Sequence, residues 1–279
     1  MIGQRRALFR VFDESTGARR GRLSRVRALT WSADLRQFVT AHKSELRAIS
    51  RPTLIDVRGC EPYEWTYDAP VGSLDWLGAR ERRSFVRALV ALAPGPDLWI
   101  LERLIDDEID SRMLLALFVL FRACLVDASG IPSQAMCRPV SRASRDRGFP
   151  LHADLYTHRR LMLAFDNVVD SGGASLFLPV ETLMHLLKST GSCPSALRRR
   201  IASLLRGRHT VDHFDELYDL LHYRKHPWVP ELERRMADSQ IVLQFGRGEG
   251  YLIDDRAWLH GRSPSSIPVT ARRFRRLAF

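Results

Sequence analysis

The chain has 279 residues, of which 45% are hydrophobic, and its formal net charge is +11. This length exceeds the usual domain size but fits one large domain, and the apolar fraction is sufficient for a proper core. The four cysteines, Cys60, Cys124, Cys137 and Cys193, show no CxxC spacing. Neither a zinc knuckle nor a disulfide framework is predicted, and a reducing cytoplasm is the expected compartment.

The positive charge is carried almost entirely by arginine, because only three of the 43 basic residues are lysines. Such a skew is typical of a GC-rich coding bias. The arginines are scattered along the chain, and clusters such as Arg198–Arg208 contain no aromatic side chains that could stack on bases. We therefore expect a solvated basic surface rather than a nucleic-acid groove, and an acidic partner such as a carrier protein stays open.

Neither a secretory signal nor a membrane span is predicted. Residues 1–22 have no apolar h-region and contain Asp13 and Glu14. The longest apolar run, Met113–Val126, is interrupted by Arg122 and is too short to cross a bilayer. It is interpreted as a buried helix.

Residues 1–140 are predicted to form helices and strands that support the core. Thr53–Gly59 has the pattern of a short strand, and Leu74–Leu92 has apolar residues at helical spacing before the breaker APGP. Ser111 is the expected cap of the apolar helix that follows, which should end near the sequence DASG.

Segments 141–180 and 236–279 are predicted to form the strands of a barrel. The first contains the runs LHADLY and RLMLAF and a turn at DSGG before ASLFLPV, and the second contains YLID after the turn GRGEG. Between them, residues 181–235 return to helical patterns that end at glycine or proline. No linker divides the chain, so residues 1–279 are expected to be one domain with a helical insertion.

The insertion is expected to pack over the mouth of the barrel. Its aromatic side chains include Phe214, Tyr218, Tyr223 and Trp228. They are interpreted either as residues that line or gate the pocket or, as is more common at helical spacing, as simple packing residues.

Three residues of the barrel segments have the pattern of a metal-ligand set. His152 and Asp154 are two apart on a predicted strand, so both side chains point to one face and can reach the same cation. His260, near the end of the predicted YLID strand, is the candidate third ligand. Two histidines and one carboxylate leave three open metal positions, as in ferrous oxygenases that bind a bidentate co-substrate and then dioxygen.

About residues 145–279 resemble the 2-oxoglutarate-dependent iron(II) oxygenases of the taurine dioxygenase and clavaminate synthase group. The resemblance rests on the PLH-x-D strand, on the turn Gly172–Ser175, and on Asp-Asp-Arg-x-x-x-His-Gly-Arg followed by arginines. It implies an α+β fold whose core is a double-stranded β-helix, the jelly-roll and cupin-like barrel of this group, with flanking helices.

Residue by residue, the resemblance implies that His152, Asp154 and His260 are the facial triad for Fe(II). Ser175, where threonine is more usual, corresponds to the hydroxyl that helps to hold 2-oxoglutarate. Arg272, twelve residues after His260, corresponds to the arginine that binds the distal carboxylate of this co-substrate. A guanidinium can grip a carboxylate with two parallel hydrogen bonds.

Other residues of the resemblance bear on the substrate and on the reaction. Arg276 corresponds to an arginine that can hold a substrate carboxylate; the alternative is that Arg276 and Arg275 pair with surface acids or with the C-terminal carboxylate at Phe279. Asp255 stands where the family often has asparagine. A carboxylate at Asp154, where related halogenases have a small residue, argues against halogenation.

The expected function is that of a 2-oxoglutarate-dependent non-haem iron dioxygenase. Such an enzyme uses O2 to hydroxylate, desaturate or cyclise a small substrate, here an amino acid or another acid of a biosynthetic pathway, and releases succinate and CO2. Three alternatives stay open. The same chemistry can act on a nucleic acid, a protein or a carrier-bound substrate, or the barrel can be a zinc or manganese enzyme that does not use 2-oxoglutarate. The third, a binding protein that retains the fold without catalysis, is disfavoured because all three metal ligands and the co-substrate arginine occur together.

Overall fold

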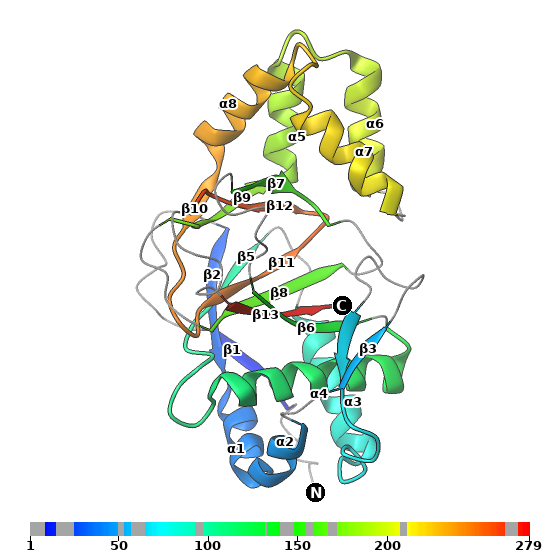
Figure 1. Ribbon diagram of the computed structural model, residues 1–279, viewed down its shortest axis with the longest axis vertical. Helices are drawn as coiled ribbons and strands as arrows, with labels where there is room; N and C mark the ends of the chain where they lie inside the picture. Colours follow the sequence, from blue (N-terminus) through cyan, green and yellow to red (C-terminus); the bar gives the residue numbers. More distant parts are fainter. Residues whose placement is uncertain are drawn as a thin grey trace, which may run out of the picture.

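The computed structural model describes eleven stretches of the chain, residues 9–14, 25–49, 53–56, 65–92, 97–131, 133–139, 148–154, 159–166, 172–206, 211–265 and 273–279. They form a mixed α/β structure with a seven-stranded sheet, a four-stranded sheet and a two-stranded sheet. Figure 1 shows the two larger sheets in the middle of the molecule, with helices at both ends.

The seven-stranded sheet combines strands from both halves of the chain. Its strands, in spatial order, are β1 (Phe12–Glu14), β2 (Val26–Trp31), β5 (Leu98–Leu101), β11 (Gly250–Asp254), β8 (Arg160–Phe165), β13 (Arg273–Ala278) and β6 (Gln134–Pro139). Neighbouring strands are antiparallel except β2 and β5, which are parallel. The predicted strands RLMLAF and YLID are confirmed as β8 and β11.

The four-stranded sheet has the order β10 (Ile241–Leu243), β9 (Ser175–Pro179), β12 (Trp258–Arg262) and β7 (Phe149–His152). It is stacked on the seven-stranded sheet (Figure 1). The contact is apolar because inward side chains of both sheets share one cluster, among them Leu163 and Tyr251 from the larger sheet and Phe177 and Trp258 from the smaller. Because successive side chains of a strand point to opposite faces, every second residue of these strands contributes to this apolar contact.

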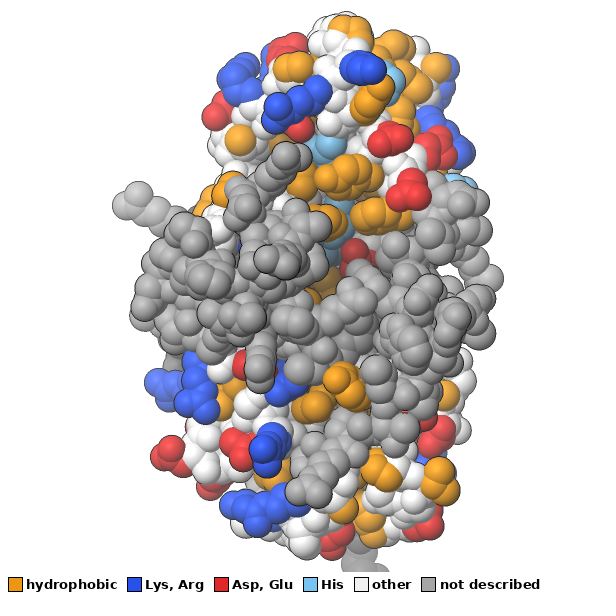
Figure 2. Space-filling view, viewed as in Figure 1, with side chains coloured by type: hydrophobic (Ala, Val, Ile, Leu, Met, Phe, Trp, Pro, Cys, Tyr) orange, Lys and Arg blue, Asp and Glu red, His pale blue; other side chains and the backbone are white. Residues whose placement is uncertain are grey.

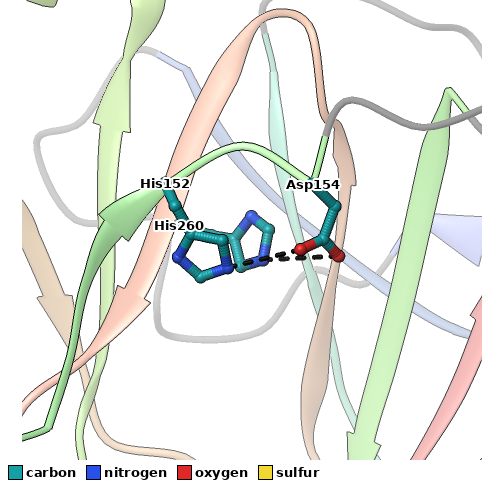
Figure 3. Close-up of side chains that lie close together, drawn as sticks. All are labelled: His152, Asp154 and His260. Atoms are coloured by element: carbon teal, nitrogen blue, oxygen red, sulfur yellow. Dashed lines mark ion pairs between the residues drawn. The ribbon is translucent and has the colours of Figure 1, made fainter. Parts of the chain in front are cut away.

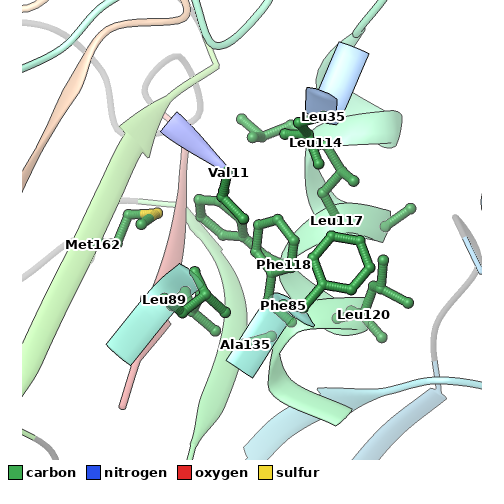
Figure 4. Packing of buried hydrophobic residues seen from close by; sticks show 14 of the residues in the cluster. Val11, Leu35, Phe85, Leu89, Leu114, Leu117, Phe118, Leu120, Ala135 and Met162 are labelled. Carbon is green, nitrogen blue, oxygen red and sulfur yellow. The ribbon is translucent and has the colours of Figure 1, made fainter. Parts of the chain in front are cut away.

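The opposite face of the seven-stranded sheet is covered by helices. These are α1 (Ala33–Ala41), α2 (Lys43–Ile49), α3 (Ala79–Ala91) and α4 (Ser111–Ser129). In β8, Met162 and Ala164 join the cluster on this side, whereas Leu161, Leu163 and Phe165 join the cluster between the sheets. Figure 4 shows side chains of α3, α4 and β8 gathered in the helix-covered cluster. A strand buried on both faces explains the continuous apolar run in its sequence.

Helix α4 confirms the predicted buried helix, since every residue from Met113 to Leu125 is buried. Its cap differs from the prediction. The Asp110 side chain accepts hydrogen bonds from the backbone N–H groups of the first turn, and Ser111 is already inside the helix. Gly130, at φ 62°, ends the helix in the left-handed conformation that favours glycine. Among the described residues, no helix is long and apolar enough to cross a membrane.

The predicted helix over Leu74–Leu92 begins five residues too early. Residues 74–77 form turns, and α3 starts at Ala79 after the N-cap Gly78. Leu74 and Leu77 are nevertheless buried. The apolar spacing therefore continues across turns closed by i→i+3 hydrogen bonds, such as that from the Leu77 N–H to the Leu74 carbonyl oxygen, which do not form an α-helix. Of the predicted strand over residues 53–59, the part 53–56 is confirmed, and both residues 57–59 and the breaker at 93–96 lie outside the described residues.

Four helices form a cap at the other end of the molecule: α5 (Val180–Ser189), α6 (Ser195–Arg206), α7 (Val211–His222) and α8 (Val229–Ser239). The helical patterns over 181–235 are confirmed, but α8, with Pro230 in its first turn, was not separately predicted and runs to Ser239. The cap packs on the outer face of the four-stranded sheet, through Leu151, Leu178 and Leu259 (Figure 1).

The one buried charge of α4, at Arg122, is compensated by the hairpin of β3 (Thr53–Asp56) and β4 (Trp65–Asp68). The Arg122 guanidinium, on a residue only 8% exposed, donates to Asp68 Oδ1 over 2.7 Å. A buried cation requires such a partner because its transfer out of water is costly. The pair thereby ties the hairpin to the helix.

We expect Asp68→Ala to lower the free energy of unfolding by about 1–3 kcal/mol, because it leaves the Arg122 charge without this acceptor. Urea unfolding followed by circular dichroism measures the change. The double variant Arg122→Met/Asp68→Ala should recover most of the loss. A single variant as stable as the wild type would contradict this account of the pair.

Candidate metal centre

The structure brings His152, Asp154 and His260 together between the two sheets. His152 ends β7 and lies directly opposite His260 on β12. The chain then continues through Ala153 to Asp154, which turns back toward both rings (Figure 3). One ligand atom from each residue lies within 4.8 Å of the others, and all three residues are buried.

Two details of the sequence interpretation are corrected here. Asp154 lies two residues beyond the end of β7 rather than within a strand. His260 is not near the end of the YLID strand, because a turn at 255–257 separates β11 from β12 and carries the chain from one sheet to the other. The three side chains converge all the same, because the register of β12 against β7 places the histidines opposite each other.

A glycine allows β12 to approach β7 this closely. A Cβ atom on Gly261 would lie 2.7 Å from the Phe149 carbonyl oxygen, which is shorter than real contacts. The register shifts at this point, between the pairs at His260 and Arg262. A residue with a side chain at position 261 would push β12 away from β7. Glycine at this position therefore allows the pairing that holds His260 opposite His152.

Both imidazoles direct the same nitrogen toward the carboxylate. His152 Nε2 is 3.4 Å from Asp154 Oδ1, and His260 Nε2 is 3.9 Å from Asp154 Oδ2. The other nitrogen, Nδ1, faces the Pro150 carbonyl oxygen at 2.9 Å in His152. An acceptor at Nδ1 fixes the proton there and leaves the Nε2 lone pair available to a metal.

The charges also suit a divalent cation. Burial lowers the pKa of His152, and the neighbouring His260 lowers it further, although contact with Asp154 opposes both effects. Burial alone would raise the pKa of Asp154, but Arg276 and the two histidines hold it well below its usual range. Burial thus favours the neutral imidazole at His152, and its neighbours keep Asp154 a carboxylate, the protonation states in which these side chains bind metals.

Arg276, on β13, contacts the carboxylate directly. Its guanidinium donates to Asp154 Oδ2 over 2.5 Å, and the residue is 8% exposed. Arg275 points to the other face of the strand, where it pairs with Asp166 at 3.0 Å. The carbonyl oxygen of Phe279 accepts from the backbone N–H groups of residues 159 and 160. Both arginines are therefore engaged in the interior rather than with surface acids.

Of the two predicted co-substrate residues, the structure describes only Ser175. Ser175 is buried at the start of β9, opposite Arg262 of β12, which is two residues from His260 and so on the same face. The glycine turn before it is present: Gly172 has φ 80°, and a Cβ there would lie 2.6 Å from the Pro264 carbonyl oxygen. Arg272 lies outside the described residues.

Helix α7 of the cap runs along β7. The ring of Phe214 lies 5.9 Å from that of His152, and the ring of Tyr218 lies 6.2 Å from that of Phe149. His222 Nε2 contacts the Leu151 carbonyl oxygen at 2.7 Å. The space-filling view shows histidine and acidic side chains just below the cap, bordered by hydrophobic ones (Figure 2). Of the four aromatic residues named from sequence, Trp228 is buried within the cap and Tyr223 is exposed.

His222, Asp255 and Arg262 are the residues near the site that sequence reasoning did not assign a role. The four-residue spacing of Phe214, Tyr218 and His222 on α7 was the available signal for the first, since such residues share a helix face. The signal for Arg262 was its two-residue spacing from His260, which places both side chains on one face of a strand. Asp255 was noted only as a departure from a family pattern.

We expect the protein to bind one Fe(II) or Co(II) ion per chain, and Asp154→Ala to weaken binding by more than the roughly 10–100-fold typical of changes behind a ligand. The reason is that the variant loses the only anion among the three ligands. Anaerobic titration with Co(II), followed by visible absorbance, measures the affinity. Asp238→Ala, which removes an exposed acid of α8, is the control and should match the wild type. Equal affinities of Asp154→Ala and the wild type would exclude this site.

Comparison with known proteins gives similarity at the level of structure only. No family model and no curated protein matches the sequence. An asparagine oxygenase, AsnO, is 15% identical over 90% of this chain and 92% of its own, with a TM-score of 0.49. The non-haem iron oxygenase OrfP, solved with iron, succinate and (3S)-hydroxy-L-arginine, is 12% identical over 90% and 93%, with a TM-score of 0.40. PvcB, an iron and α-ketoglutarate dependent oxygenase from an isonitrile synthetic pathway, is 12% identical over 74% and 81%, with a TM-score of 0.39.

Proposed function

We propose that the protein is an Fe(II) and 2-oxoglutarate-dependent oxygenase that hydroxylates, desaturates or cyclises a small substrate. The observation that carries the proposal is the convergence of His152 Nε2, His260 Nε2 and the Asp154 carboxylate in a buried site. A structural zinc site usually has four protein ligands, whereas three ligands on one side leave positions for a co-substrate and dioxygen.

The stacking of the two larger sheets supports the double-stranded β-helix as the core of this enzyme. In this proposal, segments 141–180 and 236–279 supply the strands around the site, residues 1–140 support them, and the insertion 181–235 caps them. Strands β7, β8 and β9 come from the first segment, and β10, β11, β12 and β13 come from the last. The whole chain acts as one oxygenase domain.

In the proposed enzyme, the three ligands hold Fe(II), which with 2-oxoglutarate and O2 supplies the oxidation of an unactivated carbon and the release of succinate and CO2. Ser175 and Arg272 hold the distal carboxylate of 2-oxoglutarate. Ser175 is buried on the same face as His260 and two pairs further along the ladder, and this position supports its part in the assignment. A buried hydroxyl and a guanidinium suit a carboxylate because both donate hydrogen bonds.

Arg276 is proposed to hold a carboxylate of the prime substrate. It reaches the site from β13 and lies against Asp154. A guanidinium has five N–H donors, so one can stay on Asp154 while others meet the substrate. The substrate class that fits is an amino acid or another small acid, free or attached to a carrier protein.

The basic helix α6 gives little support to a nucleic-acid substrate. Arg200 makes a two-point contact with Glu216, at 2.6 and 2.5 Å, and Arg198 donates to the backbone carbonyl of Lys188. A groove for nucleic acid needs basic side chains that are available to phosphates. These two are engaged within the cap.

The first test of this function is succinate release. Purified protein given ferrous iron, ascorbate, oxygen and 2-oxoglutarate, without a prime substrate, is expected to form succinate slowly, as measured by mass spectrometry. His152→Ala should abolish the reaction because it removes a metal ligand, whereas His185→Ala, on the exposed face of α5, should leave it unchanged. No succinate from the wild type, together with tight zinc binding, would favour a zinc enzyme instead.

A second test separates the co-substrate site from the metal site. Arg272→Ala is expected to raise the 2-oxoglutarate concentration needed for half-maximal succinate formation by roughly 10–100-fold, the equivalent of one charged contact worth about 1.5–3 kcal/mol. Co(II) affinity should not change. Arg234→Ala, an exposed arginine of α8, is the matched control. Loss of metal affinity in Arg272→Ala would contradict the assignment.

A further inference from the structure

Asp255 lies directly behind one of the two histidines. It is the first residue of the turn between β11 and β12, and the residue is only 3% exposed. Its Oδ1 atom lies 3.3 Å from His260 Nδ1, the ring nitrogen that faces away from Asp154. This separation is slightly longer than a typical N–H···O hydrogen bond, and the two buried atoms face each other without forming one in this geometry.

The turn that carries Asp255 is held by other groups. The Asp255 backbone N–H donates to the Arg159 carbonyl oxygen, and Asp254 accepts from the Arg159 side chain at 2.9 Å and from the Arg256 backbone N–H at 3.0 Å. The turn is therefore held in part by groups other than the Asp255 carboxylate.

The two histidines differ in what stands behind them. Behind His152 is a neutral acceptor, the Pro150 carbonyl oxygen at 2.9 Å, whereas behind His260 is a carboxylate. Both acceptors favour the proton on Nδ1 and leave Nε2 for a metal. A carboxylate does more than a carbonyl, because its charge makes the imidazole a stronger electron donor.

We propose that Asp255 is a positioning residue for His260: its carboxylate accepts the Nδ1–H, fixes the tautomer and ring orientation, and strengthens Nε2 as a ligand. This inference rests on the proposed metal site and adds a fourth residue to it. It also gives a use to the aspartate that stands where the resembled family often has asparagine, since asparagine offers the same acceptor oxygen without the charge.

The test uses Asp255→Ala, which removes the acceptor, and Asp255→Asn, which keeps it but removes the charge. Long-range ¹H–¹⁵N spectra of the metal-free proteins report the tautomer of His260. The wild type and Asp255→Asn are expected to carry the proton on Nδ1. Asp255→Ala is expected to show the Nε2–H tautomer, a change that a merely structural role for Asp255 would not produce.

Metal affinity is the second measurement, by anaerobic Co(II) titration. Asp255→Ala is expected to bind Co(II) roughly 10–100-fold more weakly than the wild type, and Asp255→Asn by an intermediate factor. Asp238→Asn, a change of an exposed acid on α8, is the control and should retain the wild-type affinity. Unchanged urea midpoints show that the variants are folded.

The outcomes separate this inference from the proposed function. Retention of the Nδ1–H tautomer in Asp255→Ala, or a Co(II) affinity equal to that of the wild type, overturns the role of Asp255. Failure of the wild type to bind Co(II) removes the proposed metal site, and the tautomer spectra then decide by themselves whether Asp255 orients His260.

Discussion

The pairing of β7 with β12 is the contact on which the candidate site depends. In this ladder His152 and His260 face the interior, while Leu151 and Leu259 face the cap cluster. Strand side chains alternate, so a slip of one residue would turn an imidazole toward the cap and a leucine toward the site. Burial of the leucines on one side thus stabilises the register that places the two histidines together on the other.

The same site has to tolerate a buried carboxylate before any cation is bound. Asp154 meets this requirement through Arg276, which lies against it in the interior. Without such a partner a buried anion is costly, and the group would take up a proton instead. Together Asp154 and Arg276 form a neutral pair. In the proposed complex, the two carboxylates of 2-oxoglutarate would therefore meet the charges of Fe(II) and Arg272.

Short-range patterns carried most of what could be predicted from sequence. The buried helix α4, the strands β8 and β11, and the helices of the cap follow from apolar periodicity and from glycine and proline positions. The three metal ligands followed from a two-residue spacing and a family pattern, and the structure places them together. Errors arose where the same local pattern fits two structures. The buried leucines over residues 74–77 have helical spacing, but they lie in turns before α3.

Local sequence patterns do not predict which distant strands pair with each other. Nothing in the N-terminal half indicates that β2 and β5 join the sheet that contains β11, or that they run parallel to each other. The contact of Arg276 with Asp154 joins β13 to the segment that follows β7, and that of His222 with Leu151 joins the cap to the four-stranded sheet. Such contacts depend on tertiary packing, which the sequence around each residue does not encode locally.

The position of β13 in the seven-stranded sheet has a consequence for how the protein is made. This strand lies between β8 and β6, although both precede it in the chain by more than a hundred residues. During synthesis the two partners can already be outside the ribosome while the gap between them is unfilled, which exposes two strand edges. The sheet closes only when residues 273–279 emerge. Arg276 can contact Asp154 only when β13 is in place, so the site is completed together with the sheet.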